Sequence, residues 1–281
     1  MSATALDRSP KSVTAAARPV AVRSVTLRRA IVSEWIKLRS LRSTVITLAV
    51  SLLLVAGVGV LVGAVTANQW THLQAADKAG FDPTTTALRG FLFGQLAVGV
   101  LGVLTVSSEY ATGMIRSTLA AVPKRLPALW AKCLLFGAIT LVMVTIASFI
   151  AFFGTQAALS SRQLQTSISA PGVLRAVVGC GLYLTVVGLL GLALGALMRN
   201  TAAAITTLFG VLLLLPLVFE FLPSSIKDHT YPYLPSNAGQ AILSVHQQPG
   251  MLAPWTGFAV MCGYAVAALA AAALLLKRRD A

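Results

Sequence analysis

Six stretches of this chain are each long and apolar enough to cross a bilayer, and none has an ionisable side chain at its centre. They are Thr44–Val65, Gly90–Ser107, Leu134–Ala157, Ala176–Met198, Ala202–Glu220 and Trp255–Leu276. A helix needs about 20 mostly apolar residues to span roughly 30 Å of hydrocarbon. Every peptide group in that layer must be hydrogen-bonded within the protein, so each span is expected to be helical. The sequence predicts an all-α integral membrane protein whose transmembrane domain covers residues 44–281.

The basic residues are distributed unevenly between the two sides of the predicted membrane domain. The chain has 22 Lys and Arg against 8 Asp and Glu, a formal net charge of +14. Nine of the 22 precede the first span, and a cytoplasmic N-terminus would place eight more in the inner loops and the C-terminal tail. This bias predicts that both termini are cytoplasmic. Topology and attraction to anionic lipid account for the positive charge, so membrane lipid is an expected partner and nucleic acid is not.

The segment before the first span divides into two parts. Residues 1–23 lack a hydrophobic period and predict a disordered, basic cytoplasmic tail. Residues 24–43 predict an amphipathic helix lying in the membrane interface. Its apolar stripe consists of Leu27, Ile31, Trp35, Leu38 and Leu41, and Lys37 lies off that stripe. Glu34 interrupts the apolar stripe, and its expected partner is Lys37 or a residue of another subunit.

The inner loop at 108–125 mixes charged, aromatic and large apolar residues, which is unusual for a solvated linker. Met114, Ile115 and Thr118 can share one side of a short helix along the membrane, and Pro123 would end that helix. This composition favours an elbow that faces a partner protein. The alternative is an interfacial helix that rests only on lipid.

The outer loop at 221–254 is long and contains several prolines. Loops of this length are usually functional or hold short re-entrant helices. Within it, Asn237–Leu243 is the piece expected to form such a helix.

Small and polar residues inside the spans predict close helix packing. Gly59/Gly63, Gly90/Gly94 and Gly191/Gly195 are small-xxx-small pairs, which we assign first to packing within the chain and second to a dimer face. The mid-membrane polar groups are amides and hydroxyls, such as Gln95, Ser148 and Thr185. They suit hydrogen bonds between helices or a weakly polar lumen.

Several kinds of chemistry lack the residues that they need. The sequence has no Gly-rich loop followed by Lys-Ser or Lys-Thr, so a P-loop nucleotide site is not expected. His72, His229 and His246 lie in outer loops without Cys or carboxylates at ligand spacing, and the three cysteines are dispersed. We therefore expect no catalytic, cofactor or metal residues, and no enzyme activity, in this chain alone. The uncharged span centres also disfavour an ion-coupled carrier.

Four passages, in this order on six spans, resemble the permease subunits of type-2 ATP-binding-cassette (ABC) exporters. The passages are Glu34–Ser43, Glu109–Leu119 followed by Pro123-Lys124-Arg125 and Lys132, Arg199–Ala204, and Tyr233–Gly239. The resemblance covers the chain from about Ser24 to its end. It implies a bacterial plasma-membrane protein that pairs with a second permease chain and with a separate ATPase, which would bind ATP and Mg.

The resemblance also implies a role for the loop after the second span. In that family this loop contacts the ATPase and transmits the closure of the ATPase pair to the membrane domain. The residues that would form the coupling segment here are Glu109, Tyr110, Gly113, Met114, Ile115, Arg116, Thr118, Leu119, Lys124 and Arg125. Arg116 is a candidate ion-pair former, and Met114 and Ile115 are candidate packing contacts.

The function expected from these features is ATP-driven export of a hydrophobic or amphipathic compound, powered by the partner ATPase. One alternative is a non-transporting membrane scaffold or immunity protein. The other is an ion-coupled secondary transporter.

Overall fold

The computed structural model describes residues 31–36, 42–111, 113, 125–247 and 249–278. Within these ranges the chain is helical and has six helical segments long and apolar enough to span a membrane. They are Val45–His72, Pro83–Ala111, Leu126–Ser160, Val173–Met198, Thr201–Glu220 and Pro254–Arg278. The predicted all-α class and the six spans are confirmed. The chain is a multi-pass helical membrane protein.

The long helices are α2 (Arg42–Gln69), α5 (Phe91–Ala111), α7 (Arg125–Ser160), α8 (Val173–Met198) and α13 (Pro254–Arg278). The fifth span combines α9 (Thr201–Phe209), the π-helical η2 (Gly210–Leu214) and α10 (Leu215–Glu220). The shorter elements are η1 (Trp70–His72), α3 (Ala75–Ala79), α4 (Pro83–Leu88), α11 (Ser224–Thr230), η3 (Tyr231–Tyr233), α12 (Pro235–Gln240) and η4 (Ala241–Leu243).

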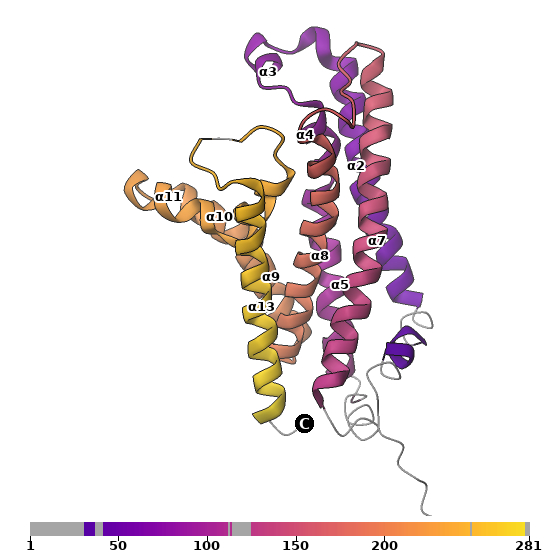
Figure 1. Ribbon diagram of the computed structural model, residues 1–281, viewed down its shortest axis with the longest axis vertical. Helices are drawn as coiled ribbons and strands as arrows, with labels where there is room; N and C mark the ends of the chain where they lie inside the picture. The colour runs from indigo at the N-terminus through magenta and orange to yellow at the C-terminus, as the bar shows by residue number, and fades with distance from the viewer. Residues whose placement is uncertain (1–30, 37–41, 112, 114–124, 248, 279–281) are drawn as a thin grey trace, which may run out of the picture.

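The long helices run roughly along the longest axis of the molecule (Figure 1). α3 lies at one end, which we call the α3 end. α5 and α8 end, and α7 begins, near the opposite end, where α13 also terminates. We call this opposite side the C-terminal end of the bundle.

Helix α8 forms the centre of the bundle. In its most apolar stretch of 18 residues, 78% of the residues are buried. Its close packing on α5 depends on glycine. A Cβ on Gly191 would overlap the carbonyl oxygen of Gly99, and a Cβ on Gly102 would overlap that of Gly188. The two backbones can approach so closely only because these side chains are absent.

The predicted glycine pairs are confirmed as packing positions within the chain. Gly59 faces the carbonyl of Ala87, and Gly63 faces Thr155 of α7. Gly90 and Gly94 both face Val55 of α2. Gly191 and Gly195 face α5. Each pair therefore holds α2, α5, α7 or α8 against a neighbouring element.

The fifth span bends away from the bundle after α9 (Figure 1). In the π turn the N–H of Leu215 bonds to the carbonyl of Gly210, five residues back. Pro216 follows immediately and has no N–H to offer to an α-helical ladder. A π turn beside a proline is a common cause of a sharp change in helix direction. α10 and α11 consequently project to one side.

The segment after η3 turns back into the bundle as a buried helical piece. All residues of α12 except Gln240, and all three residues of η4, are buried. Gly239 packs on the ring of Tyr183 in α8, and Gly257 of α13 packs on Ala238. The segment Asn237–Leu243 is thus helical, as predicted, and buried in the bundle.

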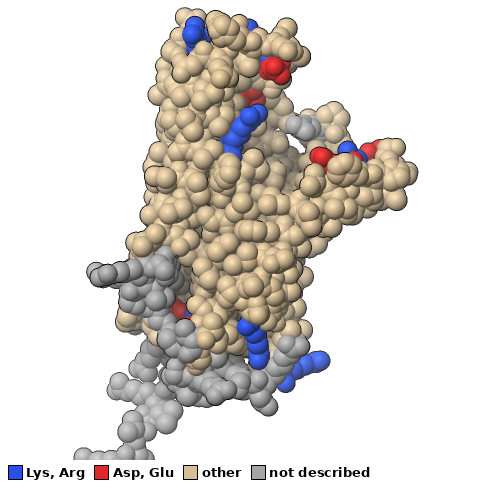
Figure 2. Space-filling view, turned by 180° about the vertical axis from the view of Figure 1, so that it is seen from behind, with Lys and Arg blue, Asp and Glu red and all other residues tan. Residues whose placement is uncertain are grey.

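The charged side chains on the face seen in Figure 2 lie toward the two ends of the molecule and on the projecting arm. A broad uncharged band separates them. This distribution suits a protein whose middle is surrounded by hydrocarbon, because a charge at the bilayer centre is costly.

Candidate functional site

A buried ion-pair cluster lies at the C-terminal end of the bundle. The ammonium of Lys132 in α7 donates to Glu34 Oε2 at 2.6 Å and to Glu109 Oε1 at 2.7 Å. The side chains are 6%, 7% and 5% exposed, respectively. One cation thus connects three segments that are far apart in the sequence: residues 31–36, the end of α5 and the start of α7.

Local structure places each member of the cluster. Glu109 lies in the last turn of α5, which ends at Ala111. Lys132 lies seven residues into α7, close to two full turns from its start. Residues 31–36 are helical, and Glu34 is the buried one among them.

Glu34 was expected to interrupt the apolar stripe, with Lys37 or a residue of another subunit as its partner. The structure shows a partner that was not expected, whereas Lys37 lies outside the described residues and the pairing with it stays a prediction. Glu34 faces the bundle and pairs with Lys132 of the same chain. Trp35 and Ile36 lie on the outward side and are 48% and 62% exposed.

The cluster carries one positive and two negative formal charges. Removing charges from water is expensive, and mutual attraction compensates only when the geometry is good. The two short charge-assisted hydrogen bonds provide such geometry. Loss of Lys132 would remove one ion pair from each of two buried carboxylates, whereas loss of either glutamate would remove one.

The end of α5 also contacts the turn between α8 and α9. The guanidinium of Arg199 lies 5.2 Å from the ring centroid of Tyr110, a cation–π distance. The hydroxyl of Thr201 donates to Ser107 Oγ at 2.9 Å. Together with the ion-pair cluster these contacts form what we call the α5 junction. Its members are Glu34, Ser107, Glu109, Tyr110, Lys132, Arg199 and Thr201.

The turn between α8 and α9 has its own structural basis. Arg199 adopts a left-handed conformation with φ +51°, and its N–H bonds to the carbonyl of Gly195 to end α8. Asn200 then caps α9, because its side chain accepts from the N–H of Ala203 at 3.0 Å. A left-handed cap followed by an Asn N-cap gives a tight reversal. This reversal presents Arg199 to Tyr110.

The structure describes only part of the predicted coupling segment. Glu109 and Tyr110 are brought together in the junction. Gly113 is exposed and has a positive φ of 71°, and Arg125 is the first residue of α7. The coupling residues outside the described ranges are Met114, Ile115, Arg116, Thr118, Leu119 and Lys124. Their role stays a prediction.

The predicted interfacial helix and tail are likewise covered only in part. Ile31 is half-buried, while Glu34 and Trp35 lie as described above. The remaining predicted positions, Leu27, Lys37, Leu38 and Leu41, and the tail at 1–23 lie outside the described residues.

Sequence reasoning missed Lys132 as a member of the site. The third span was expected to begin at Leu134, whereas α7 begins nine residues earlier at Arg125. Lys132 therefore lies inside a helix and not in a loop. A signal was present, because Leu126, Leu129 and Trp130 already follow helical spacing before the hydrophobic core of the span.

A buried polar pair lies within the helix bundle. The hydroxyl of Tyr183 in α8 donates to Gln95 Oε1 in α5 at 2.6 Å, so the predicted interhelical role holds for Gln95. The hydroxyls of Ser148 and Thr185 donate to the carbonyls of Val144 and Gly181 on their own helices, and Ser148 of α7 also hydrogen-bonds the side chain of Cys180 in α8. A bond to a carbonyl of the same helix gives a hydroxyl in the membrane an acceptor without help from a neighbouring helix.

A hollow of about 610 Å³ lies at the α3 end. The segment between α2 and α5 contributes Asp77, Asp82 and Arg89, and the segment after η4 contributes Val245 and His246. These two loops therefore meet around a surface of mixed polarity. Among the described residues no group of three or more His, Cys, Asp or Glu could hold a metal ion.

Comparison with protein-family models finds none that matches this chain, and comparison with curated proteins finds no match either.

Proposed function

We propose that this chain is the membrane-spanning permease subunit of an ABC exporter in the bacterial plasma membrane. It would move a hydrophobic or amphipathic compound, working with a second permease chain and with a separate ATPase that binds ATP and Mg. Both termini would face the cytoplasm. The observation that carries the proposal is the α5 junction, which attaches the helix leading into the coupling loop to three other segments of the bundle.

The junction gives a physical route for a force applied to that loop. α5 ends at Ala111, directly before the predicted coupling segment. Its last turns are attached to residues 31–36 and α7 through Lys132, and to the α8–α9 turn through Tyr110 and Ser107. A push on the loop would therefore move several spans together, as a power stroke supplied from outside the chain requires.

The pattern of charge within the spans supports an external energy source. Among the described residues, the buried charged side chains are Glu34, Glu109 and Lys132, all at the C-terminal end of the bundle. Ion-coupled carriers generally hold ionisable groups near mid-membrane, where the coupling ion binds. The arrangement here favours the ABC permease over the carrier.

The test isolates the tagged full-length chain from membranes of its own host under mild detergent and identifies stoichiometric partners by mass spectrometry. We expect a cassette ATPase to co-purify, and the reconstituted complex to move lipophilic dyes in response to ATP. Transport by the purified chain alone, driven only by a proton or sodium gradient, would overturn the proposal. If no ATPase co-purifies and no transport is measured, the scaffold alternative is favoured.

Charge reversal in the coupling loop tests the assigned contact. Arg116→Glu is expected to reduce ATPase association at least tenfold, because an ion pair would become a repulsion. Arg278→Glu is the matched control, since it reverses a charge at the last residue of α13, outside the loop. Equal association of both variants would refute the coupling assignment.

A further inference from the structure

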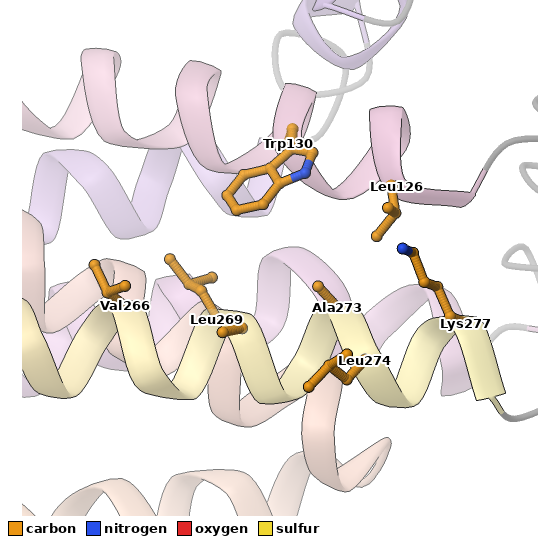
Figure 3. A pocket seen from close by; sticks show the side chains of 8 residues that line it. Leu126, Trp130, Val266, Leu269, Ala273, Leu274 and Lys277 are labelled. Carbon is orange, nitrogen blue, oxygen red and sulfur yellow. The ribbon is translucent and has the colours of Figure 1, made fainter.

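A groove between α7 and α13 opens at the C-terminal end of the bundle. Its volume is about 370 Å³. Leu126 and Trp130 of α7 form one wall, and α13 forms the other (Figure 3). The residues contributed by α13 are Val266, Leu269, Ala270, Ala273, Leu274 and Lys277. Apart from the end of Lys277, the lining is apolar.

The groove has the length of one lipid leaflet. Val266 and Lys277 are eleven residues apart on α13, which is about 16 Å along the helix axis. Half of the hydrocarbon layer is about 15 Å thick. With Lys277 at the membrane surface, the groove would therefore reach to about the bilayer midplane.

The sides of the groove are open to the surrounding lipid. Trp130, Leu274 and Val266 are 43%, 56% and 64% exposed. An acyl chain can thus enter sideways, and the indole of Trp130 would contact it.

The mouth of the groove carries a positive charge. The ammonium of Lys277 extends toward Leu126 across the mouth (Figure 3). The salt bridges of the described residues do not include Lys277. A lysine at the membrane surface attracts the phosphate of an anionic lipid.

We propose that this groove binds one acyl chain of an anionic glycerophospholipid, with the lipid phosphate held by Lys277. Apolar walls alone would accept any acyl chain, and the lysine supplies the selection for headgroup charge. The proposal goes beyond the transport function and does not depend on it.

The experiment uses a full-length variant in which Trp130 is the remaining tryptophan (Trp35→Phe, Trp70→Phe, Trp255→Phe). It is reconstituted into vesicles containing a fixed fraction of phospholipid with dibrominated acyl chains. Bromine quenches tryptophan fluorescence on contact. The brominated lipid is phosphatidylglycerol in one series and phosphatidylcholine in the other.

We expect brominated phosphatidylglycerol to bind next to Trp130 about fivefold more strongly than brominated phosphatidylcholine. Lys277→Gln should abolish this preference. Arg278→Gln, the adjacent control, should preserve it, because Arg278 does not line the groove. Ala270→Leu fills the groove at an exposed position and should reduce quenching by both lipids.

Three outcomes would overturn the proposal. Equal quenching by the two lipids would show that the groove does not select for headgroup charge. A preference that persists in Lys277→Gln would place the selection elsewhere. Absence of quenching by either lipid would mean that protein covers the groove. Circular dichroism of each variant checks that the helices are intact.

Discussion

The ammonium of Lys132 lies 2.6 Å from the carboxylate of Glu34, a residue 98 positions earlier in the chain. The contact attaches residues 31–36 to the bundle near the start of α7, where both side chains are buried. The same ammonium also donates to the carboxylate of Glu109. One side chain therefore joins both carboxylates to the start of α7.

Lys132→Met should lower the free energy of unfolding by about 3–5 kcal/mol, because each of two buried carboxylates loses its ion pair with the ammonium. Unfolding by SDS in mixed micelles, followed by circular dichroism, measures the change. Lys277→Met is the matched control and should change stability by less than about 0.5 kcal/mol.

A fully apolar replacement of the cluster separates charge from packing. The triple variant Glu34→Leu, Lys132→Met, Glu109→Leu should be more stable than Lys132→Met alone, since it removes the buried charges together with their partner. A triple variant as unstable as the single one would show that the cluster stabilises by shape and not by electrostatics.

Gly191→Ala should destabilise the protein by about 1–3 kcal/mol, because the new methyl group meets the backbone of Gly99 and α5 must move away from α8. The same unfolding assay measures this loss. Gly263→Ala in α13 is the matched control, as nothing lies within 4 Å of its added Cβ. Similar effects of the two substitutions would argue against glycine-dependent packing of α5 on α8.

Tyr183→Phe should lower stability by about 1–2 kcal/mol, since the carbonyl of Gln95 loses its donor in a buried site. The double variant Gln95→Leu, Tyr183→Phe should lose less than the sum of the single losses. Tyr264→Phe, which removes an exposed hydroxyl bonded to the carbonyl of Tyr233, should have a smaller effect. Additive losses at positions 95 and 183 would show that the two side chains do not interact.

The six spans could be predicted because length and hydropathy alone decide whether a segment crosses a membrane. The glycine pairs could be assigned to intrachain packing because a chain with six spans has many helix faces to bury. The helical piece in the outer loop could be predicted from the length of that loop, because backbone groups without hydrogen bonds are not tolerated in lipid.

The α5 junction could not be assembled from the sequence. A hydropathy pattern places the centre of a span well but its polar ends poorly, and Lys132 lies in such an end. Pairing of Glu34 with Lys132 depends on where two distant helices meet, which no local period encodes. The π turn before Pro216 was missed for a related reason, since proline predicts a bend but not how the backbone accommodates it.

The phenol of Tyr231 is expected to ionise at a higher pH than free tyrosine. Partial burial raises the pKa of Tyr231, and the nearby carboxylate of Glu220, 3.3 Å from its hydroxyl, raises it further. The neutral phenol is thus favoured in the folded protein. Its contribution to stability is fully present below a pH of about 10 and is lost as the pH rises through the folded pKa.

Glu220→Gln should lower the pKa of Tyr231 while leaving it above that of free tyrosine, because the negative charge disappears but the burial remains. Ultraviolet difference titration of tyrosinate measures this shift, with Tyr231→Phe subtracted to isolate the single phenol. Asp228→Asn is a matched control, since it removes an exposed carboxylate from α11 that does not raise the pKa of Tyr231. If Glu220→Gln left the titration of Tyr231 unchanged, the carboxylate would not act on the phenol, and burial alone would have to explain the raised pKa.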